Sequence, residues 1–357
     1  MLHKLKEVLK QQNMITGYLY FYVHFITEVA CFFVLSRLIG DSLFLWMAPF
    51  VYDAFAFVPQ ALIGYAGDRF PKINFGVIGV LLLLLGFITF SLDIIPGAYT
   101  ELIFLCLGNA CIHVAGAEAT LRTSKGKLSH SAIFVSGGSF GVITGKLLGK
   151  TSLTFWIVAI LCLTMIPFIL LADCYKTECR EEDLEKFNYA NKDIKPTLVI
   201  LLAVLIVITR GYMGYGIPTS WNKTITQTIL LYVAMGFGKA LGGILSDAFG
   251  IRKIAVLSIG IALPFLLFGD NIMIISLIGV LLFSMTMSIT LALLVSILKK
   301  SPGLAFGLTT IGLFLGTAPI FFFTFTTTRA NCLVITVLTV LCLAITNKII
   351  IKGDPDG

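Results

Sequence analysis

The chain has 357 residues, of which 57% are hydrophobic and only 13% are charged, and its mean hydropathy is +0.96. A soluble domain carries about 25% charged residues, so this composition excludes an ordinary soluble protein. The formal net charge is +7. In a membrane protein, basic residues gather in cytoplasmic loops beside anionic lipid, so this charge does not indicate a nucleic-acid partner. We therefore expect a helical protein embedded in the lipid bilayer.

Apolar segments of about 20 residues, the length that crosses a bilayer, recur along the whole chain. They are apolar on all faces and show no period of two, which excludes an outer-membrane β-barrel. In chain order they cover 14–38, 43–66, 73–93, 100–121, 130–149, 152–173, 197–218, 224–246, 251–269, 272–297, 303–325 and 331–350. The sequence thus predicts an all-α membrane protein with twelve transmembrane helices.

One polar stretch, 173–196, separates the first six predicted helices from the last six. We interpret it as a central loop between an N-terminal half (1–172) and a C-terminal half (197–357). Loops on the side of the termini and of this stretch hold 19 of the 26 Lys and Arg residues, whereas the opposite loops hold Arg37, Lys146, Lys150, Lys223 and Arg329. The positive-inside rule then predicts a multi-pass protein of the cell (inner) membrane, with both termini and the central loop in the cytoplasm.

The eight cysteines are scattered along the chain, mostly inside apolar segments. Cys174 and Cys179 have no second pair and no nearby histidine that would complete a zinc site. We expect free thiols, no bound metal and no cofactor. The basic lead-in at 1–13 lacks a small-residue cleavage site, so we expect no removable signal peptide.

Two charged loops interrupt the apolar sequence at corresponding points of the two halves. "GYAGDRFPK" (64–72) follows the second predicted helix, and "GGILSDAFGIRK" (242–253) follows the eighth. Their aspartates, Asp68 and Asp247, are 179 residues apart, half of the chain length. Equal halves that carry the same signature indicate a parallel duplication of the kind found in secondary transporters.

Both loops resemble the Gly-x-x-x-Asp-(Arg)-x-Gly-x-(Arg/Lys)-(Arg/Lys) motif of the major facilitator superfamily, although the first has Pro71 in place of the usual glycine. The resemblance implies a transporter of two six-helix halves that works as a monomer by alternating access. In that family the motif acts in gating. This role would fall on Gly64, Asp68, Arg69, Gly243, Asp247, Arg252 and Lys253.

The resemblance also implies where the two aspartates point. Asp68 would face the start of the eleventh predicted helix, at Ser301-Pro302, and Asp247 would face the start of the fifth, at Ser129. Unpaired N–H groups and the helix dipole favour an anion at a helix N-terminus, and Ser followed by Pro is a good N-cap and first-turn pair. We therefore expect two latches between the halves on the cytoplasmic side.

Glycines at four-residue spacing mark three predicted helices, where they allow close helix contacts in lipid. In the resembled fold, the fifth helix meets the eighth between the halves, and the second meets the eleventh. We therefore expect a smooth glycine seam there that would suit a rocking motion, with static packing as the alternative. The glycines are Gly137, Gly141, Gly145 and Gly149 in the fifth helix, Gly238 and Gly242 in the eighth, and Gly303, Gly307, Gly312 and Gly316 in the eleventh.

Ionisable groups inside the predicted helices are costly in a membrane and are candidates for function. The N-terminal half holds the candidate proton-coupling groups His24, Glu28 and Asp53, of which the first two share a helix face. The C-terminal half holds Arg210 and Lys239, which we expect to bind an anionic group on the substrate, since a guanidinium pairs well with carboxylate or phosphate. Further substrate-binding candidates are Asn109, His113, Tyr212 and Tyr215.

Each of these assignments has a structural alternative. Glu28 could form an internal ion pair with Arg210 that touches no substrate, and His113 could be a packed histidine. Glu118 lies four residues before Arg122 and is expected to join the gate network. Trp221 is expected in an interfacial aromatic belt.

The leading hypothesis is a proton-coupled secondary transporter for a small organic anion or amphiphile. The alternatives are a drug or lipid exporter, a membrane enzyme or metal-dependent protein built on His24, Glu28 and His113, and a receptor or scaffold. The chain departs from two patterns of the resembled family: the fourth predicted helix lacks the mid-helix arginine of many proton-coupled members, and the fifth lacks the glycine-proline pair typical of drug/proton antiporters. These departures disfavour drug exchange. The repeated motif argues against the enzyme, and the short loops argue against the scaffold.

Overall fold

A computed structural model describes residues 14–41, 47–92, 98–177, 182–322 and 328–351. Within these ranges every regular element is a helix, apart from an isolated bridge between Ala190 and Ile350. The basic lead-in at 1–13, Cys179 and Arg180 lie outside the described residues. The all-α class expected from the sequence is therefore confirmed for the part of the chain that the structure covers.

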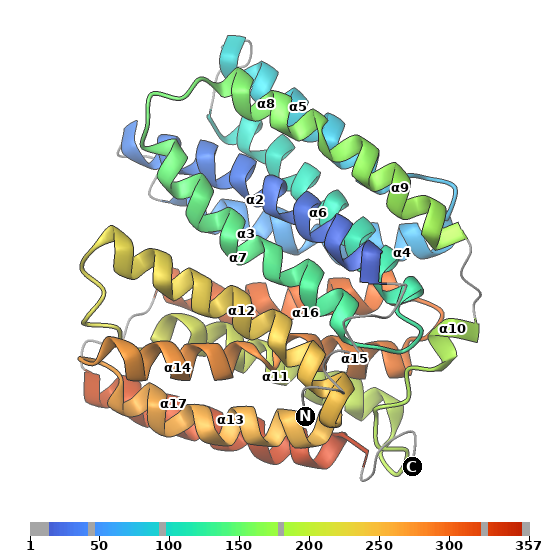
Figure 1. The fold of residues 1–357 in the computed structure, drawn as a ribbon, viewed down its shortest axis with the longest axis vertical. Helices are drawn as coiled ribbons and strands as arrows, with labels where there is room; N and C mark the ends of the chain where they lie inside the picture. Colours follow the sequence, from blue (N-terminus) through green and yellow to red (C-terminus); the bar gives the residue numbers. More distant parts are fainter. Residues whose placement is uncertain (1–13, 42–46, 93–97, 178–181, 323–327, 352–357) are drawn as a thin grey trace.

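The helices form two bundles that follow the two halves of the sequence (Figure 1). In Figure 1 the blue-to-green bundle lies above the yellow-to-red one, and the short helix α10 (Glu182–Glu185) lies between them. The first bundle contains α2 (Ile15–Asp41), α3 (Ala48–Phe57), α4 (Pro59–Arg69), α5 (Phe75–Leu92), α6 (Ala98–Thr123), α7 (Ser129–Gly149), α8 (Phe155–Leu163) and α9 (Met165–Thr177). The second contains α11 (Pro196–Gly216), α12 (Ile225–Phe249), α13 (Ile251–Phe268), α14 (Met273–Ser284), α15 (Met287–Ile297), α16 (Pro302–Thr317), η3 (Ala318–Phe321) and α17 (Thr328–Ile349).

Ten helical segments of the described chain are long and apolar enough to cross a membrane. The twelve-helix count is not confirmed, because two predicted segments fall short of that criterion. The segment at 43–66 is divided into α3 and α4 at Pro59, which has no N–H to continue the helical bonding, although Val58 keeps helical dihedrals of −65° and −43°. The segment at 73–93 forms the 18-residue helix α5.

The glycine seam of α7 faces a different neighbour from the expected one. A methyl group added at Gly137, Gly141, Gly145 or Gly149 would meet backbone carbonyls of α2, in the same half. Gly238 and Gly242 likewise face α14, and Gly312 and Gly316 face α11. The expectation of a seam between the fifth and eighth helices is therefore wrong: most of these glycines let helices of one half approach one another.

The expected contact between the second and eleventh predicted helices is present, where α4 packs on α16 at Gly303 and Gly307, and α7 packs on α12. A methyl group at Gly64 would meet the backbone of Gly303, and one at Gly307 would meet Ala61. In the second contact Gly243 lies against Leu128 and Ala132. Both motif glycines, Gly64 and Gly243, thus lie where the halves touch.

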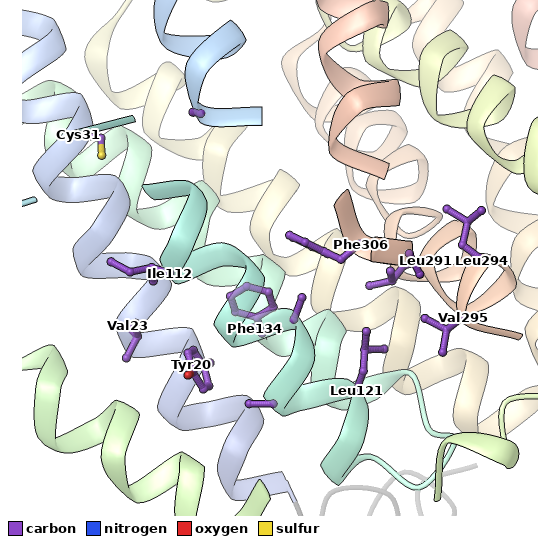
Figure 2. Close-up of a cluster of buried hydrophobic side chains, with 14 of the residues drawn as sticks. Tyr20, Val23, Cys31, Ile112, Leu121, Phe134, Leu291, Leu294, Val295 and Phe306 are labelled. Carbon is purple, nitrogen blue, oxygen red and sulfur yellow. The ribbon is translucent and has the colours of Figure 1, made fainter. Parts of the chain in front are cut away.

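A continuous apolar core joins the bundles near this contact. Figure 2 shows Phe306 of α16 between Phe134 of α7 and Leu291 of α15. The rings of Phe134 and Phe306 have centroids 6.2 Å apart. Phe306 therefore connects the C-terminal half to the N-terminal one by packing.

The central loop, expected as a polar connection, packs against both halves. The Tyr189 hydroxyl donates to the Gly126 carbonyl at 2.5 Å, while the Tyr189 N–H donates to the Ser296 hydroxyl at 3.1 Å. The Lys299 ammonium pairs with the Glu185 carboxylate at 2.9 Å. This loop fastens the two bundles at the end where the charged motifs lie.

Candidate functional site

Each motif aspartate binds the start of a helix in the opposite half. The Asp68 carboxylate accepts hydrogen bonds from the N–H groups of Gly303 and Leu304, at 3.0 and 2.9 Å. The Asp247 carboxylate accepts from those of Leu128 and Ser129, both at 2.8 Å. These are the two contacts that the family resemblance implies. We call the first pair the α16 latch, the second the α7 latch, and the end of the bundle that carries them the latch end.

The capping chemistry differs from the expectation at Ser301. Neither Ser301 before α16 nor Leu128 before α7 makes a side-chain cap. The N–H groups that a helix leaves unpaired at its start are instead satisfied by a carboxylate from the other half. The start of each helix is therefore completed only while the halves are in contact.

The basic motif residues lie beside the latches rather than in them. The Arg69 guanidinium lies 5.7 Å from the ring of Tyr65 on its own helix, and Arg252 donates to the Asn347 amide oxygen at 2.6 and 3.1 Å. Lys253 is exposed. None of the three forms an ion pair with Asp68 or Asp247 among the described residues.

An ion-pair network supports the α16 latch. Arg122 lies 4.0 Å from Asp68 and pairs with Glu118 at 2.9 Å, as expected for a gate network. Lys176 of α9 completes the network at 3.0 Å from Glu118. The sequence analysis missed Lys176, because nothing in the spacing shows that the end of the sixth predicted helix returns beside the fourth.

Pro71 has a structural explanation. Gly250, 179 residues later, connects α12 to α13 as a single residue with φ of +94°, a conformation that glycine adopts without steric cost. The first loop runs from Phe70 to Asn74, and no positive φ occurs in it. Proline, whose φ is fixed near −65°, therefore fits at 71 but would not fit at 250.

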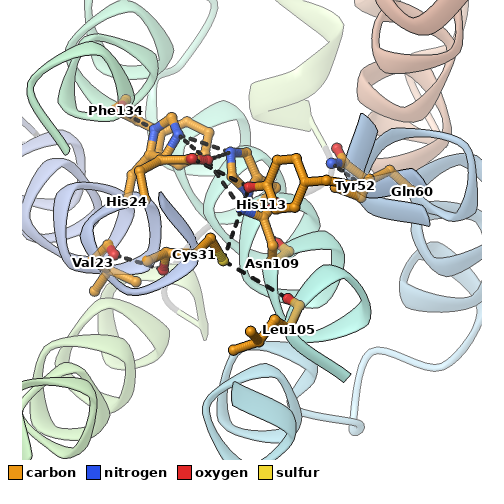
Figure 3. Close-up of polar contacts among 12 residues, drawn as sticks. Val23, His24, Cys31, Tyr52, Gln60, Leu105, Asn109, His113 and Phe134 are labelled. Atoms are coloured by element: carbon orange, nitrogen blue, oxygen red, sulfur yellow. Dashed lines mark hydrogen bonds and ion pairs between the residues drawn. The ribbon is translucent and has the colours of Figure 1, made fainter. Parts of the chain in front are cut away.

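A polar cluster lies in the middle of the N-terminal half, formed by α2, α3 and α6 (Figure 3). The Asn109 amide donates to Glu28 Oε1 at 3.0 Å and to the Tyr52 hydroxyl at 2.9 Å. The Tyr52 hydroxyl donates to Glu28 Oε2 at 3.4 Å. All three side chains are buried, with Glu28 only 6% exposed.

Two histidines complete this cluster, which we call the central cluster: His24, Glu28, Tyr52, Asn109 and His113. His24 Nε2 and His113 Nε2 are 2.8 Å apart. Glu28 Oε1 lies 3.6 Å from the first and 3.4 Å from the second. These ligand atoms all lie within 4.8 Å of one another, so the convergence that the metal hypothesis requires is present. Tyr52 was missed in the sequence analysis, since a tyrosine in an apolar helix carries no positional signal of its own.

The two buried cations of the C-terminal half, Arg210 and Lys239, form no ion pair among the described residues. The Arg210 guanidinium carbon lies 5.7 Å from the centre of the Phe283 ring, and Arg210 Nε is buried without a hydrogen-bond partner. The alternative of an internal Glu28–Arg210 pair is therefore wrong. Lys239 lies within electrostatic reach of both Glu28 and Arg210, which places these three charges around one region.

The remaining candidates lie towards the end opposite the latches. Asp53 is buried, with the Thr317 hydroxyl and the Lys146 ammonium as its favourable electrostatic neighbours. Lys146 donates to the Tyr232 hydroxyl of the other half at 2.8 Å, a contact that its assignment to a loop had missed. Tyr212 is half-buried and Tyr215 is exposed.

Two smaller expectations have clear outcomes. Trp221 is 7% exposed, so it is not part of an exposed interfacial belt. Six cysteines within the described residues are free thiols, as expected, and five of them are buried: Cys31, Cys106, Cys111, Cys162 and Cys342, with Cys332 partly exposed.

No family model matches the sequence, and no curated protein sequence matches it. Several solved structures share its fold. A major facilitator superfamily transporter, FucP, in the outward conformation has a TM-score of 0.67 at 13% identity, covering 95% of this chain and 98% of that one. The human organic anion transporter MFSD10 (TETRAN) has a TM-score of 0.68 at 13% identity, covering 94% and 100%.

The proton:xylose symporter XylE, bound to 6-bromo-6-deoxy-D-glucose, is also similar, with a TM-score of 0.59 at 13% identity over 96% of this chain and 94% of that one. At such identities the likeness is one of fold. The likeness covers nearly the whole chain in each case. In this chain, the motif aspartate of each half also binds a helix start of the other half. The chain therefore has the fold of the major facilitator superfamily transporters.

Proposed function

We propose that the protein is a secondary active transporter that moves a small organic anion across the membrane by alternating access, coupled to protons. The observation that carries this proposal is the pair of reciprocal latches, in which each half completes a helix start of the other. We further propose that α3 with α4, and α5, complete a set of twelve membrane crossings in two halves, and that the latch end faces the cytoplasm of the cell (inner) membrane.

The latches make two states of the molecule chemically plausible. With the halves in contact, each carboxylate satisfies two N–H groups, and charged hydrogen bonds of this kind are worth about 1.5–3 kcal/mol. When the halves separate, water can satisfy the same N–H groups and carboxylates. The free-energy difference between the states is then small enough for a substrate to reverse it. The gating role of the motif rests on this argument.

Arg210 and Lys239 are proposed to bind the anionic group of the substrate. A buried cation that lacks a counter-ion is costly, and a substrate carboxylate or phosphate would supply one through the planar face of the guanidinium. Tyr212 and Tyr215 follow Arg210 along α11 and would provide aromatic contacts. The likeness in fold to the human organic anion transporter MFSD10 supports this class of substrate.

The coupling groups are proposed to be Glu28, His24 and Asp53, all in the half opposite these cations. Asn109 and His113 contact the Glu28 carboxylate from α6. The substrate and the proton would therefore bind in the same central region. Proton binding beside an anion site lowers the net charge that must cross the membrane, which is the electrostatic reason to couple the two.

Uptake by the purified protein in proteoliposomes tests the proposal. The panel should contain radiolabelled mono- and dicarboxylates, an organic phosphate, a neutral amphiphile, a drug-like cation and a lipid, each with and without a proton gradient. We expect proton-stimulated uptake of an anion, reduced about 10- to 100-fold by Arg210→Ala, the size expected from the loss of a charged hydrogen bond. Arg329→Ala, which removes an exposed cation, is the matched control.

Three outcomes would count against the assignment. Transport of only the amphiphile, the drug or the lipid would favour the exporter. Unchanged uptake in Arg210→Ala would remove the anion site. The absence of any transport, in vesicles where a reference transporter works, would contradict the proposed function itself.

A further inference from the structure

The hydrogen bonds of His24 and His113 fix which ring nitrogens carry protons. His24 Nδ1 lies 2.9 Å from the Phe134 carbonyl oxygen, and His113 Nδ1 lies 2.9 Å from the Asn109 carbonyl oxygen. A carbonyl oxygen can only accept a hydrogen bond, so both Nδ1 atoms must be N–H donors. In a neutral imidazole the other nitrogen then bears a lone pair. If both rings were neutral, two lone pairs would face each other across 2.8 Å.

We propose that His24 and His113 share one proton between their Nε2 atoms, so that this histidine pair, rather than the Glu28 carboxyl, carries the coupling proton. The coupling role rests on the proposed function, whereas the shared proton rests on the geometry alone. One ring is an imidazolium that donates Nε2–H to the lone pair of the other. Release transfers this single proton to water and leaves two neutral rings.

Charge balance within the central cluster supports the shared proton. With Glu28 ionised, a protonated pair makes the cluster neutral, while an unprotonated pair leaves one uncompensated negative charge inside the membrane. The carboxylate is already held by the Asn109 amide and the Tyr52 hydroxyl. It therefore acts as a fixed counter-ion 3.4 to 3.6 Å from the two Nε2 atoms.

The neighbouring helices add few other charges to the described surroundings. The pair itself is faced by Glu28 on α2, Lys239 on α12, the Phe134 carbonyl on α7 and the Phe306 ring on α16. Cys31 and Tyr52 contact Asn109, and Asp53 is an electrostatic neighbour of Glu28. Lys239 opposes a positive charge on the pair, and Glu28 favours one. An anion bound at Lys239 would offset the first effect, which couples anion binding to retention of the proton.

A metal ion would fit the same donors less well. Two nitrogen ligands of a tetrahedral zinc ion, each about 2.0–2.1 Å from the metal, lie about 3.3 Å apart. The observed 2.8 Å between the Nε2 atoms is shorter than this and matches an N–H···N hydrogen bond. The distance therefore favours a proton as the shared cation.

The pair is in contact with the α16 latch through one aromatic ring. Phe306 of α16 stacks on His113, with centroids 6.5 Å apart and planes inclined by 20°, and also packs on Phe134. It lies one turn beyond Gly303 and Leu304, whose N–H groups bind Asp68. Loss of the proton would drive the two rings apart and change the surface on which this turn of α16 rests. The latched state is thus the protonated one.

Solid-state ¹⁵N NMR of histidine-labelled protein in lipid tests the shared proton directly, since the chain has only four histidines. At neutral pH we expect both Nδ1 atoms of the pair to be protonated and a coupling across one Nε2–H···Nε2 bond. His24→Asn and His113→Asn should abolish the coupling, while His130→Asn should leave it. A lone pair on either Nδ1 would overturn the proposal. So would one equivalent of metal in the purified protein whose removal shifts both Nε2 signals.

Transport by the same variants tests the coupling role. An asparagine amide can still donate to the carbonyl that the Nδ1–H group bound, but it removes the Nε2 atom. In His24→Asn and His113→Asn we expect proton-driven accumulation of the anion to fall at least about 10-fold, with anion exchange at equal pH retained. Accumulation at the wild-type level would overturn the coupling role. If no anion moves in the wild type, the proposed function fails, and the NMR result still decides whether the proton is shared.

Discussion

The α16 latch and the α7 latch are the same contact in different surroundings. In each, a motif aspartate accepts two N–H bonds from the start of a helix in the opposite half, at 2.8 to 3.0 Å. In the α16 latch the carboxylate also lies beside Arg122, which pairs with Glu118. The loop that follows each aspartate differs as well, since Gly250 needs a positive φ and Pro71 cannot have one.

The comparison shows which features of the motif are the same in both halves and which have changed. Both copies keep the glycine four residues before the aspartate, the aspartate itself and the helix start that it binds. The loop and the ionic support have diverged. The contact between the halves is therefore the shared function of the motif, and each of the following experiments compares one latch with the other.

Adding a methyl group at the motif glycines should have the largest effect. Gly64→Ala would place its Cβ against the backbone of Gly303, and Gly243→Ala would place its Cβ against Leu128 and Ala132. Either change must push the halves apart and break the charged hydrogen bonds, worth about 1.5–3 kcal/mol. Amide hydrogen exchange at the latched N–H groups should rise about 10- to 100-fold, and more in Gly64→Ala, where the nearest atoms are all backbone.

Gly260→Ala is the control for this comparison, because its Cβ would enter open space. Unchanged exchange in Gly64→Ala would mean that the halves do not need this close approach. The measurement is hydrogen–deuterium exchange read by mass spectrometry on peptides that contain 303–304 and 128–129.

Removing the charge of a latch aspartate should have a smaller effect. Asp68→Asn or Asp247→Asn keeps one acceptor oxygen, so about 1 kcal/mol is lost and exchange should rise about fivefold. Because both latches hold the same two bodies together, we expect each variant to raise exchange at both helix starts. A rise in exchange at the altered latch alone would show that the latches open independently. The two latches would then not form one gate.

The sequence predicted the latches because their signal is local and repeated. Asp68 and Asp247 each lie four residues after a glycine at the end of an apolar helix, and a family resemblance supplied their partners. The location of the charged candidates was also predictable, since ionisable residues stand out in apolar helices. The sequence therefore predicts His24, Glu28, Asn109 and His113 as candidates without any knowledge of their contacts.

The sequence does not show which neighbouring helix a given side chain contacts. The glycine seam of α7 was assigned to the wrong neighbour, because four-residue spacing defines a face but not the helix that it meets. Tyr52, Lys176 and Phe306 were missed for the same reason. Their importance comes from long-range packing, which leaves no periodic signal in a chain that is apolar on all faces.

The two loop residues offer a smaller and more local test. Gly250→Ala forces a side chain into a left-handed conformation and should cost about 1–2 kcal/mol. Pro71→Gly removes no such strain and acts mainly by loosening the unfolded chain, at a cost below about 1 kcal/mol. Thermal unfolding in detergent should therefore show a clear loss of Tm for Gly250→Ala and a slight one for Pro71→Gly. Equal losses would contradict the explanation given for Pro71.

The smallest effect is expected from the feature found only at the α16 latch. Arg122→Gln removes the ion pair with Glu118 and the 4.0 Å contact with Asp68, and a partly solvated pair of this kind is worth about 0.2–1 kcal/mol. Exchange at 303–304 should rise up to about fivefold in low salt, and the difference from the wild type should shrink in high salt because mobile ions screen the pair. Among the described residues Asp247 forms no ion pair, and Lys127 is its cationic neighbour without such a contact, so Lys127→Gln is the matched variant and should raise exchange at 128–129 less than Arg122→Gln raises it at 303–304. If the effect of Arg122→Gln did not depend on salt, the arginine would act through packing. The ion pair of Arg122 would then add nothing to the stability of the α16 latch.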